Sequence, residues 1–188
     1  MRGLFRYGIR FILIHNIVIS HVLETLAGLS GGVVSIDGRC ASGKTTLANE
    51  LCKELDATIV SMDDFFLPPS LRSQARFNEA GGNIHYERFA EEVLPFLASG
   101  EAFSYNIFDC RVMDYNGKRE VPASPWRIVE GTYSHHPFFG DYADFKFFLS
   151  VDAQEQKERI LRRNGADMLK MFVDKWIPLE EEYFKSLS

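Results

Sequence analysis

Hydrophobic residues follow two different patterns along this chain. Short runs rich in β-branched residues predict strands, and longer segments with apolar positions every three or four residues predict helices. The predicted strands are Val33–Asp37, Thr58–Ser61, Arg127–Glu130 and Phe145–Val151, with Phe103–Phe108 as a further candidate. The predicted helices are Thr45–Leu55, Tyr86–Ala98, Ala153–Arg163 and Met168–Phe184. Because strands and helices alternate, we expect an α/β fold with a mainly parallel sheet.

Two polar stretches interrupt this alternation. Leu67–Asn83 carries two prolines and two glycines, and we expect a loop or short-helical excursion there. Tyr105–Pro125 contains Asn116-Gly117 between alternating residues, which favours a small β-hairpin. Ligands of open α/β sheets bind at the carboxyl ends of the strands, so these excursions are expected to gather over a site there.

The N-terminal segment has a different pattern. Three arginines precede the apolar run Phe11–Ile14, but polar residues interrupt the segment well short of the roughly 20 apolar residues that span a bilayer. Asn16, Ser20 and Glu24 recur at every fourth position and form one polar stripe. We therefore expect a helix that packs on the core or on a partner, with a membrane-surface role as the alternative.

The composition indicates one compact domain. The chain has 188 residues, of which 46 % are hydrophobic, and a net charge of −5. This charge disfavours a nucleic-acid partner. Its three cysteines fit no zinc spacing, and reduced thiols suit a cytoplasmic protein. We assign residues 1–30 to a helical extension and 31–188 to the main domain, and we expect no membrane partner.

The segment Gly38–Thr45 fits the phosphate-binding pattern G-x-x-x-x-G-K-[ST], with a strand before it and a helix after it. The two glycines allow a tight turn whose N–H groups point at phosphate oxygens. Lys44 then reaches the β- and γ-phosphates, and the Thr45 hydroxyl can ligate Mg²⁺. The residues expected to contact the nucleotide are Gly38, Ala41, Ser42, Gly43, Lys44, Thr45 and Thr46.

Acidic residues end two of the predicted strands. Asp63 and Asp64 directly follow one strand, where a carboxylate can accept the proton of a substrate hydroxyl during phosphoryl transfer. Capping of the next segment is the structural alternative. Glu130 ends another strand and is a candidate to hold Mg²⁺ or to bind a substrate hydroxyl. By contrast, Asp152 is expected to cap the helix that starts at Ala153.

A basic cluster lies on the helix that ends near Asn164-Gly165. Arg159, Arg162 and Arg163 can neutralise charge on the transferring phosphate, or they form a solvated face paired with acidic neighbours. The remaining candidates lie in the loops. His85, Tyr105 and His136 are assigned to the substrate; His135, Asp109, Arg111, Arg72 and Arg76 are weaker candidates.

Three motifs together resemble those of a known group: Ile36–Ala48, Ser61–Pro68 and Ile128–Gly131 are similar to the uridine kinase and nicotinamide riboside kinase branch of the P-loop kinases. The resemblance implies a five-stranded parallel sheet flanked by helices, with a short arginine lid formed by Arg159, Arg162 and Arg163. It implies that ATP and Mg²⁺ are used to phosphorylate a nucleoside 5′-hydroxyl, with Asp63 as the base and Glu130 near the metal and the sugar.

Alternatives to a nucleoside kinase remain. A kinase for a non-nucleoside alcohol needs the same loop and base. A regulatory NTPase is disfavoured because the chain lacks both a guanine-reading Asn-Lys-x-Asp segment and an apolar strand ending in Asp-Glu. A binding-only relative is disfavoured by the intact Lys44, Thr45 and Asp63. Under any of these the N-terminal helix leaves a homo-oligomer possible.

Overall fold

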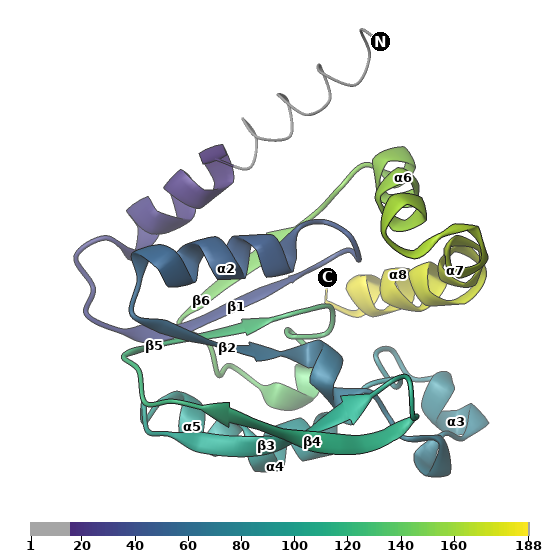
Figure 1. Ribbon diagram of the computed structural model, residues 1–188, viewed down its shortest axis with the longest axis horizontal. Coiled ribbons are helices and arrows are strands. Elements are labelled where there is room, and N and C mark those ends of the chain that lie inside the picture. Colours follow the sequence, from purple (N-terminus) through teal and green to yellow (C-terminus); the bar gives the residue numbers. More distant parts are fainter. Residues whose placement is uncertain (1–15, 188) are drawn as a thin grey trace, which may run out of the picture.

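A four-stranded parallel sheet forms the centre of the protein, in a computed structural model that describes residues 16–187 (Figure 1). Its strand order is β2-β5-β1-β6. The strands are β1 (Gly32–Gly38), β2 (Ala57–Ser61), β5 (Trp126–Glu130) and β6 (Phe145–Leu149). The register places Ile36 opposite Glu130 and Gly38 opposite Leu149. The phosphate loop, the acid after β2 and the acid of β5 therefore meet at the carboxyl edge of the sheet.

Helices cover both faces of this sheet. The helices are residues 16–26, α2 (Lys44–Glu54), α3 (Gln74–Phe77), α4 (Tyr86–Glu92), α5 (Leu94–Leu97), α6 (Ala153–Asn164), α7 (Ala166–Met171) and α8 (Ile177–Ser186), with a π-helical turn at Phe172–Trp176. Short 3-10 turns occupy Met62–Phe65, Pro69–Leu71 and Pro137–Phe139. The helix at 16–26 and α2 lie on one side of the sheet, and α4 and α5 lie on the other (Figure 1).

Two apolar cores follow from this layering. One joins Val22 and Leu26 of the first described helix to Leu47 and Leu51 of α2. The second, on the opposite face, is rich in aromatic rings, with Phe65 and Phe89 meeting edge to face at 5.1 Å. Because both faces of the sheet are covered, the β1 residues 33–38 are all buried, including the polar Ser35 and Asp37.

The second sheet corrects two expectations. The parallel sheet of the described residues has four strands rather than the five that the resemblance implies, and the candidate strand near 103–108 pairs elsewhere. It forms β3 (Phe103–Asp109), which pairs antiparallel with β4 (Asp114–Val121). The expected hairpin is present, but its turn lies at residues 110–113. Asn116 and Gly117 instead lie inside β4 where the register shifts, and there the two residues face Ile107 alone.

The long helices of the sequence analysis are divided at prolines. The helix expected at Tyr86–Ala98 breaks at Val93, two residues before Pro95. The one expected at Met168–Phe184 consists of α7, the π-helical turn and α8, with Pro178 in the first turn of α8. Proline lacks the N–H that a helix interior needs, so each segment restarts near it. The cap of α6 is confirmed, because Asp152 accepts the N–H groups of Gln154 and Glu155.

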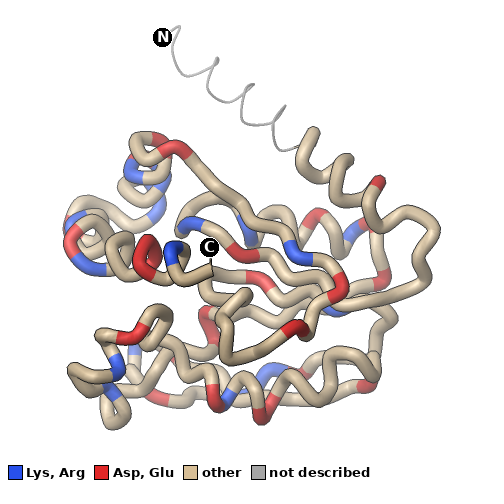
Figure 2. Tube along the Cα trace, turned by 180° about the vertical axis from the view of Figure 1, so that it is seen from behind, with Lys and Arg blue, Asp and Glu red and all other residues tan. Residues whose placement is uncertain are grey.

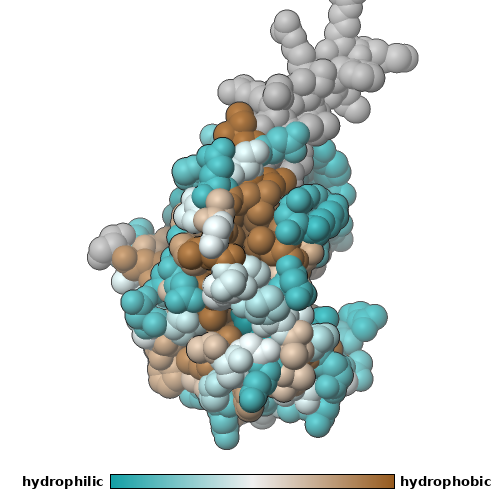
Figure 3. All heavy atoms as spheres, turned by 90° about the vertical axis from the view of Figure 1, so that its left-hand side faces the viewer, coloured by the Kyte–Doolittle hydropathy of each residue, from teal (hydrophilic) through white to brown (hydrophobic). Residues whose placement is uncertain are grey.

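The described part of the N-terminal segment is helical, whereas Phe11–Ile14 and the arginines before it lie outside the described residues. Figure 3 shows hydrophobic residues between hydrophilic ones on this side of the molecule. Within the helix, Ile17 is exposed. No described helix is both long and apolar enough to cross a bilayer. Charges of both signs are interspersed over the described chain (Figure 2).

Candidate functional site

The phosphate loop connects β1 to α2, and its two glycines are needed for different reasons. Gly38 has a φ of 135°, and a Cβ there would overlap the carbonyl oxygen of Leu149 on β6. Gly43 has a φ of 102° at the start of α2, with no other atom near the position of a Cβ. Ala41 also has a positive φ, of 59°. The loop is therefore held in a strained, compact path in front of the helix N-terminus.

Lys44 is buried at the start of α2, and its ammonium group lies inside the loop. It donates to the carbonyl oxygens of Gly38 and Arg39, each at 2.8 Å, and to the Thr132 hydroxyl at 3.1 Å. These three acceptors hold the charge where the pattern places the β- and γ-phosphates.

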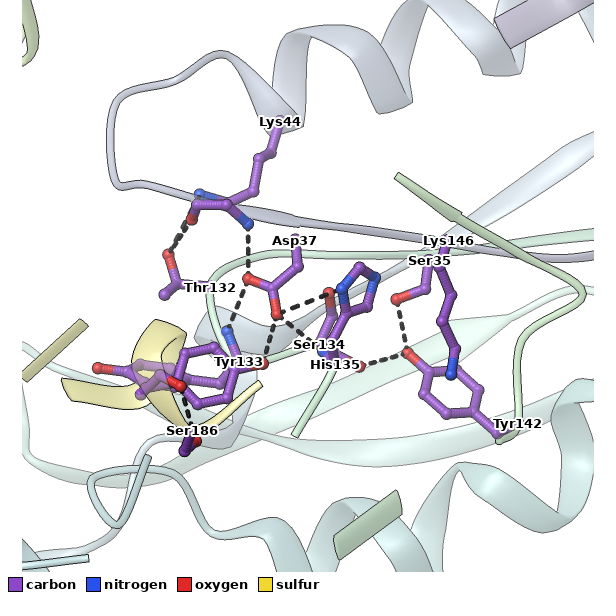
Figure 4. A network of polar contacts seen from close by, with 12 residues as sticks. Ser35, Asp37, Lys44, Thr132, Tyr133, Ser134, His135, Tyr142, Lys146 and Ser186 are labelled. Carbon is purple, nitrogen blue, oxygen red and sulfur yellow. Dashed lines mark hydrogen bonds and ion pairs between the residues drawn. The ribbon is translucent and has the colours of Figure 1, made fainter. Parts of the chain in front are cut away.

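A buried carboxylate fixes the end of β1. Asp37 accepts the N–H groups of Gly38 at 2.6 Å, Tyr133 at 3.2 Å and His135 at 2.8 Å (Figure 4). The Tyr183 hydroxyl of α8 adds a fourth bond, at 2.6 Å. Burial and the neighbouring Asp37 raise the pKa of Tyr183, so its hydroxyl stays protonated and donates. Sequence reasoning missed Asp37, although it carries the same strand-end signal as Glu130.

Helix α8 contacts the loop again beyond Asp37. The Glu180 carboxylate accepts the Cys40 N–H at 3.0 Å, and Glu181 forms an ion pair with Arg39. Burial is the main cause of the raised pKa of Glu180, which the nearby Lys44 partly offsets. The C-terminal helix thus supports the outer wall of the phosphate loop, and no local sequence pattern indicated this.

The carboxylate of Glu130 is buried at the end of β5 and bridges two hydroxyls. Thr45 donates to one carboxylate oxygen and Ser61 to the other, both at 3.0 Å. Burial and the nearby Asp63 raise the pKa of Glu130, and the two hydroxyl donors oppose this shift. Thr45 and Glu130, the two residues assigned to the metal, are therefore in direct contact.

The two aspartates after β2 have different surroundings. Asp63 opens into a cavity of about 710 Å³, which the phosphate loop also lines. The cavity walls remove solvent from around its carboxyl group, and this desolvation raises the pKa of Asp63. The positive charges of Lys44 and Arg163 oppose the shift. Asp64 is buried instead, where it accepts the Tyr105 hydroxyl at 2.8 Å and pairs with Arg119 at 2.7 Å. Of the pair, Asp63 is therefore the one available to a ligand.

The cavity brings together most of the residues assigned to phosphoryl transfer. These are Ala41, Gly43, Lys44, Thr45, Thr46, Asp63, Glu130, Arg159 and Arg163. Arg159 contacts the loop directly, donating to the Ala41 carbonyl oxygen at 2.9 Å and pairing with Glu155 at 2.7 Å. Pairing with an acidic neighbour such as Glu155 was the structural alternative for the basic cluster. Arg159 therefore fits both that alternative and a position beside the phosphate loop.

Other assigned residues do not line this cavity. Gly38 and Ser42 belong to the phosphate loop but do not line the cavity, and Arg162 is exposed on α6. The other three substrate candidates are held by other contacts: Tyr105 on β3 by Asp64, His85 by the Tyr115 hydroxyl at 2.9 Å, and His136 by the Ala80 carbonyl oxygen at 3.1 Å.

Several lining residues were not foreseen. Sequence reasoning gave no signal for the aromatic and polar walls, which include Phe66, Phe77, Asn83, Tyr133, Lys175 and Trp176. The positions of Phe77, Asn83, Lys175 and Trp176 depend on how the excursion at 67–83 and the turn at 172–176 fold toward each other.

The oxygen donors at Thr45 and Glu130 suit Mg²⁺ that arrives with a nucleotide. Nowhere in residues 16–187 do three His, Cys, Asp or Glu side chains form a group able to hold a metal by themselves. Mg²⁺ commonly binds one or two protein oxygens and takes its other ligands from phosphates and water. Thr45 and Glu130 therefore fit an ion that takes its other ligands from a nucleotide and water.

The fold and the loop together define an α/β protein of the P-loop class. In sequence, the chain is 28 % identical over 142 residues to human nicotinamide riboside kinase 2, an alignment that covers 70 % of this chain. The chain spans 57 % of the length of that relative. No family model matches the sequence.

Solved structures share the fold. A possible uridine kinase from Bacillus stearothermophilus has a TM-score of 0.67 at 19 % identity, covering 89 % of this chain and 90 % of that one. D-glycerate 3-kinase from Cryptococcus neoformans has a TM-score of 0.62 at 16 % identity, covering 89 % and 87 %. The resemblance inferred from the motifs is confirmed: the chain is similar to the uridine kinase-like P-loop kinases.

Proposed function

We propose that this protein is an ATP-dependent kinase that transfers the γ-phosphate to a hydroxyl group of a small molecule. One observation carries the proposal: a single cavity joins the phosphate loop with Lys44 to the open carboxylate of Asp63. A kinase needs these two groups on either side of the transferring phosphate.

In the proposed reaction, the acceptor hydroxyl lies against Asp63 and its oxygen attacks the γ-phosphorus. The new O–P bond forms as the bond between the γ-phosphorus and the bridging oxygen breaks, and that electron pair leaves with ADP. The hydroxyl proton passes to the Asp63 carboxylate. A raised pKa suits this role, because a base works best when its pKa approaches the working pH.

The remaining residues act on charge and position. Lys44 binds the β- and γ-phosphates, and Arg163 and Arg159 neutralise charge that develops during transfer. Thr45 and Glu130 would hold the Mg²⁺ that accompanies ATP, and the ion supplies further charge neutralisation at the phosphates. Glu130 also keeps Thr45 oriented through the 3.0 Å hydrogen bond between them.

A nucleoside 5′-hydroxyl is one candidate acceptor, supported by similarity to nicotinamide riboside kinase 2. A non-nucleoside alcohol is the second candidate. It is favoured by the absence of Tyr105 and His85 from the cavity wall and is compatible with the fold similarity to D-glycerate 3-kinase. We place such an enzyme in the cytoplasm, with the helix at 16–26 as a candidate contact in a homo-oligomer.

The test is an ATP-consumption screen over nucleosides, sugars and other alcohols, with Asp63→Asn as the variant. The proposal expects ATP consumption that depends on an acceptor and falls at least a hundredfold in the variant. Asp141→Asn is the matched control, since that side chain is exposed and pairs only with Lys146 in the described chain. Hydrolysis that needs no acceptor and is unchanged in Asp63→Asn would favour a regulatory NTPase instead.

A further inference from the structure

Arg72 is a cation on the cavity wall to which the proposed reaction gives no role. It lies in the excursion between β2 and α4, and it lines the same cavity as Asp63. Within residues 16–187 its guanidinium makes a single hydrogen bond, from Nε to the carbonyl oxygen of Leu67 at 2.8 Å. No carboxylate of the described chain pairs with it, so both terminal NH₂ groups stay available.

The position of Arg72 is fixed by the root of the excursion. The Leu67 N–H donates to the Asn83 carbonyl oxygen at 2.9 Å, and Phe66 forms a bridge with Ile84. The Leu67 carbonyl oxygen that holds Arg72 therefore belongs to a segment that is paired with residues 83–84. A guanidinium anchored through Nε presents its other edge as a fork of two N–H donors.

Arg76, in the same excursion, has a structural role that contrasts with the position of Arg72. Arg76 donates to both carboxylate oxygens of Glu87, at 2.7 and 2.8 Å, and to the carbonyl oxygens of Gly82 and Ile84. Its charge is neutralised and its donors are used within the excursion. Arg72 lacks this compensation, although it is half-buried beside the cavity.

A second cation lies on the same cavity. The ammonium of Lys175, in the π-helical turn, is 5.0 Å from the ring centre of Phe77 and 4.9 Å from that of Trp176. It has no carboxylate partner in the described chain. The cavity wall that carries Asp63 thus also carries two cations, Arg72 and Lys175, with which no carboxylate of the described residues pairs.

We propose that the acceptor carries an anionic group, a carboxylate or a phosphate, beside its reactive hydroxyl, and that Arg72 binds this group. The inference rests on the proposed kinase function and names the class of its acceptor. A fork of two charge-assisted hydrogen bonds orients a bound anion, so that the hydroxyl on the other end of a short molecule faces Asp63. The same two cations repel positively charged acceptors.

The experiment compares acceptors that differ in charge: glycerate and glycerol 3-phosphate against glycerol, and gluconate against sorbitol and uridine. Arg72→Gln is expected to raise the KM of the anionic acceptor about tenfold or more, with the KM of ATP little changed. Arg72→Lys restores part of this loss. Lys53→Gln, on the exposed face of α2, leaves both values unchanged.

Binding provides the second measurement. With ADP present, an anionic probe is expected to raise the melting temperature of the wild type but not of Arg72→Gln. Glycerate and inorganic phosphate as probes separate the carboxylate from the phosphate source. The inference is overturned if no anionic probe shows this Arg72-dependent effect and none is phosphorylated.

Other results separate the two proposals. Suppose that the neutral acceptors glycerol, sorbitol and uridine are phosphorylated faster than the anionic ones and that activity is still lost in Asp63→Asn. This result leaves the kinase function intact and refutes the anionic acceptor. A rise in the KM of ATP, or an equal fall in kcat for every acceptor in Arg72→Gln, places Arg72 on the γ-phosphate instead. Acceptor-independent hydrolysis that is unchanged in Asp63→Asn refutes the kinase function itself.

Discussion

The hydroxyl of Tyr183 donates to Oδ2 of Asp37 at 2.6 Å across 146 positions of sequence. This bond joins α8 to the strand that leads into the phosphate loop. Tyr183→Phe removes a donor from a buried carboxylate, and we expect a loss of about 1.5–3 kcal/mol of unfolding free energy. Urea denaturation measures it, with Tyr115→Phe at the more exposed hairpin as the control. Equal losses in the two variants would show that the bond to Asp37 has no special weight.

The two glycines of the phosphate loop predict different costs for alanine. In Gly38→Ala the new Cβ meets the backbone of Leu149, so β1 and β6 must move apart. In Gly43→Ala only the positive φ is strained, at a cost of about 1–3 kcal/mol. We expect Gly38→Ala to be the more destabilising, as measured by the denaturation midpoint. A reversed order would contradict the close approach of the two strands.

Lys44 is expected to be essential for transfer but not for folding. Lys44→Met removes the charge that binds the β- and γ-phosphates, and comparable losses of charge stabilisation cost about 10²–10³-fold in kcat. Steady-state kinetics and stabilisation by ATP in thermal melts measure the effect. Lys53→Met, whose ammonium pairs with Glu50 on the surface, is the matched control and should behave as wild type.

The raised pKa of Asp63 predicts opposite effects on activity and stability. The base must be ionised, so activity rises as the pH increases through its folded-state pKa. The contribution of Asp63 to the free energy of unfolding changes with pH in the opposite direction. Because the folded protein binds this proton more tightly than the unfolded chain, Asp63 favours folding at acid pH, and this contribution is lost as the pH rises through the raised pKa.

Asp63→Asn should therefore be inactive yet more stable than wild type at neutral pH, with the difference shrinking in acid. Thermal melts of both proteins from pH 4 to pH 8 test this expectation. A variant that is less stable than wild type at neutral pH would mean that the ionised carboxylate has favourable partners in the folded state.

Most of the residues predicted for the phosphate side of the candidate site line one cavity, because their positions depend on local spacing. Lys44 and Thr45 are fixed by the loop pattern, and Asp63 and Glu130 by their places at strand ends. The same strand-end signal was available for Asp37. Asp37 lies one residue before the loop pattern, and its partners Tyr133, His135 and Tyr183 are distant in sequence, so local spacing does not indicate its role.

The acceptor side could not be derived in the same way. Tyr105 lies on β3, where strand pairing turns its side chain into the core toward Asp64. Cavity walls such as Phe77 and Trp176 come from segments about a hundred residues apart that meet only in the folded protein. The strand count also failed for a non-local reason: the run near 103–108 finds its partner in β4 rather than in the parallel sheet.

The support that α8 gives to the phosphate loop has a consequence for how the protein is made. Asp37 and Cys40 leave the ribosome about 140 residues before their partners Tyr183 and Glu180. A nascent chain can form β1 and α2, but the loop between them lacks these contacts until α8 has emerged. The phosphate loop is therefore expected to reach its final arrangement only after α8 has been synthesised, which limits nucleotide capture by chains that still lack this helix.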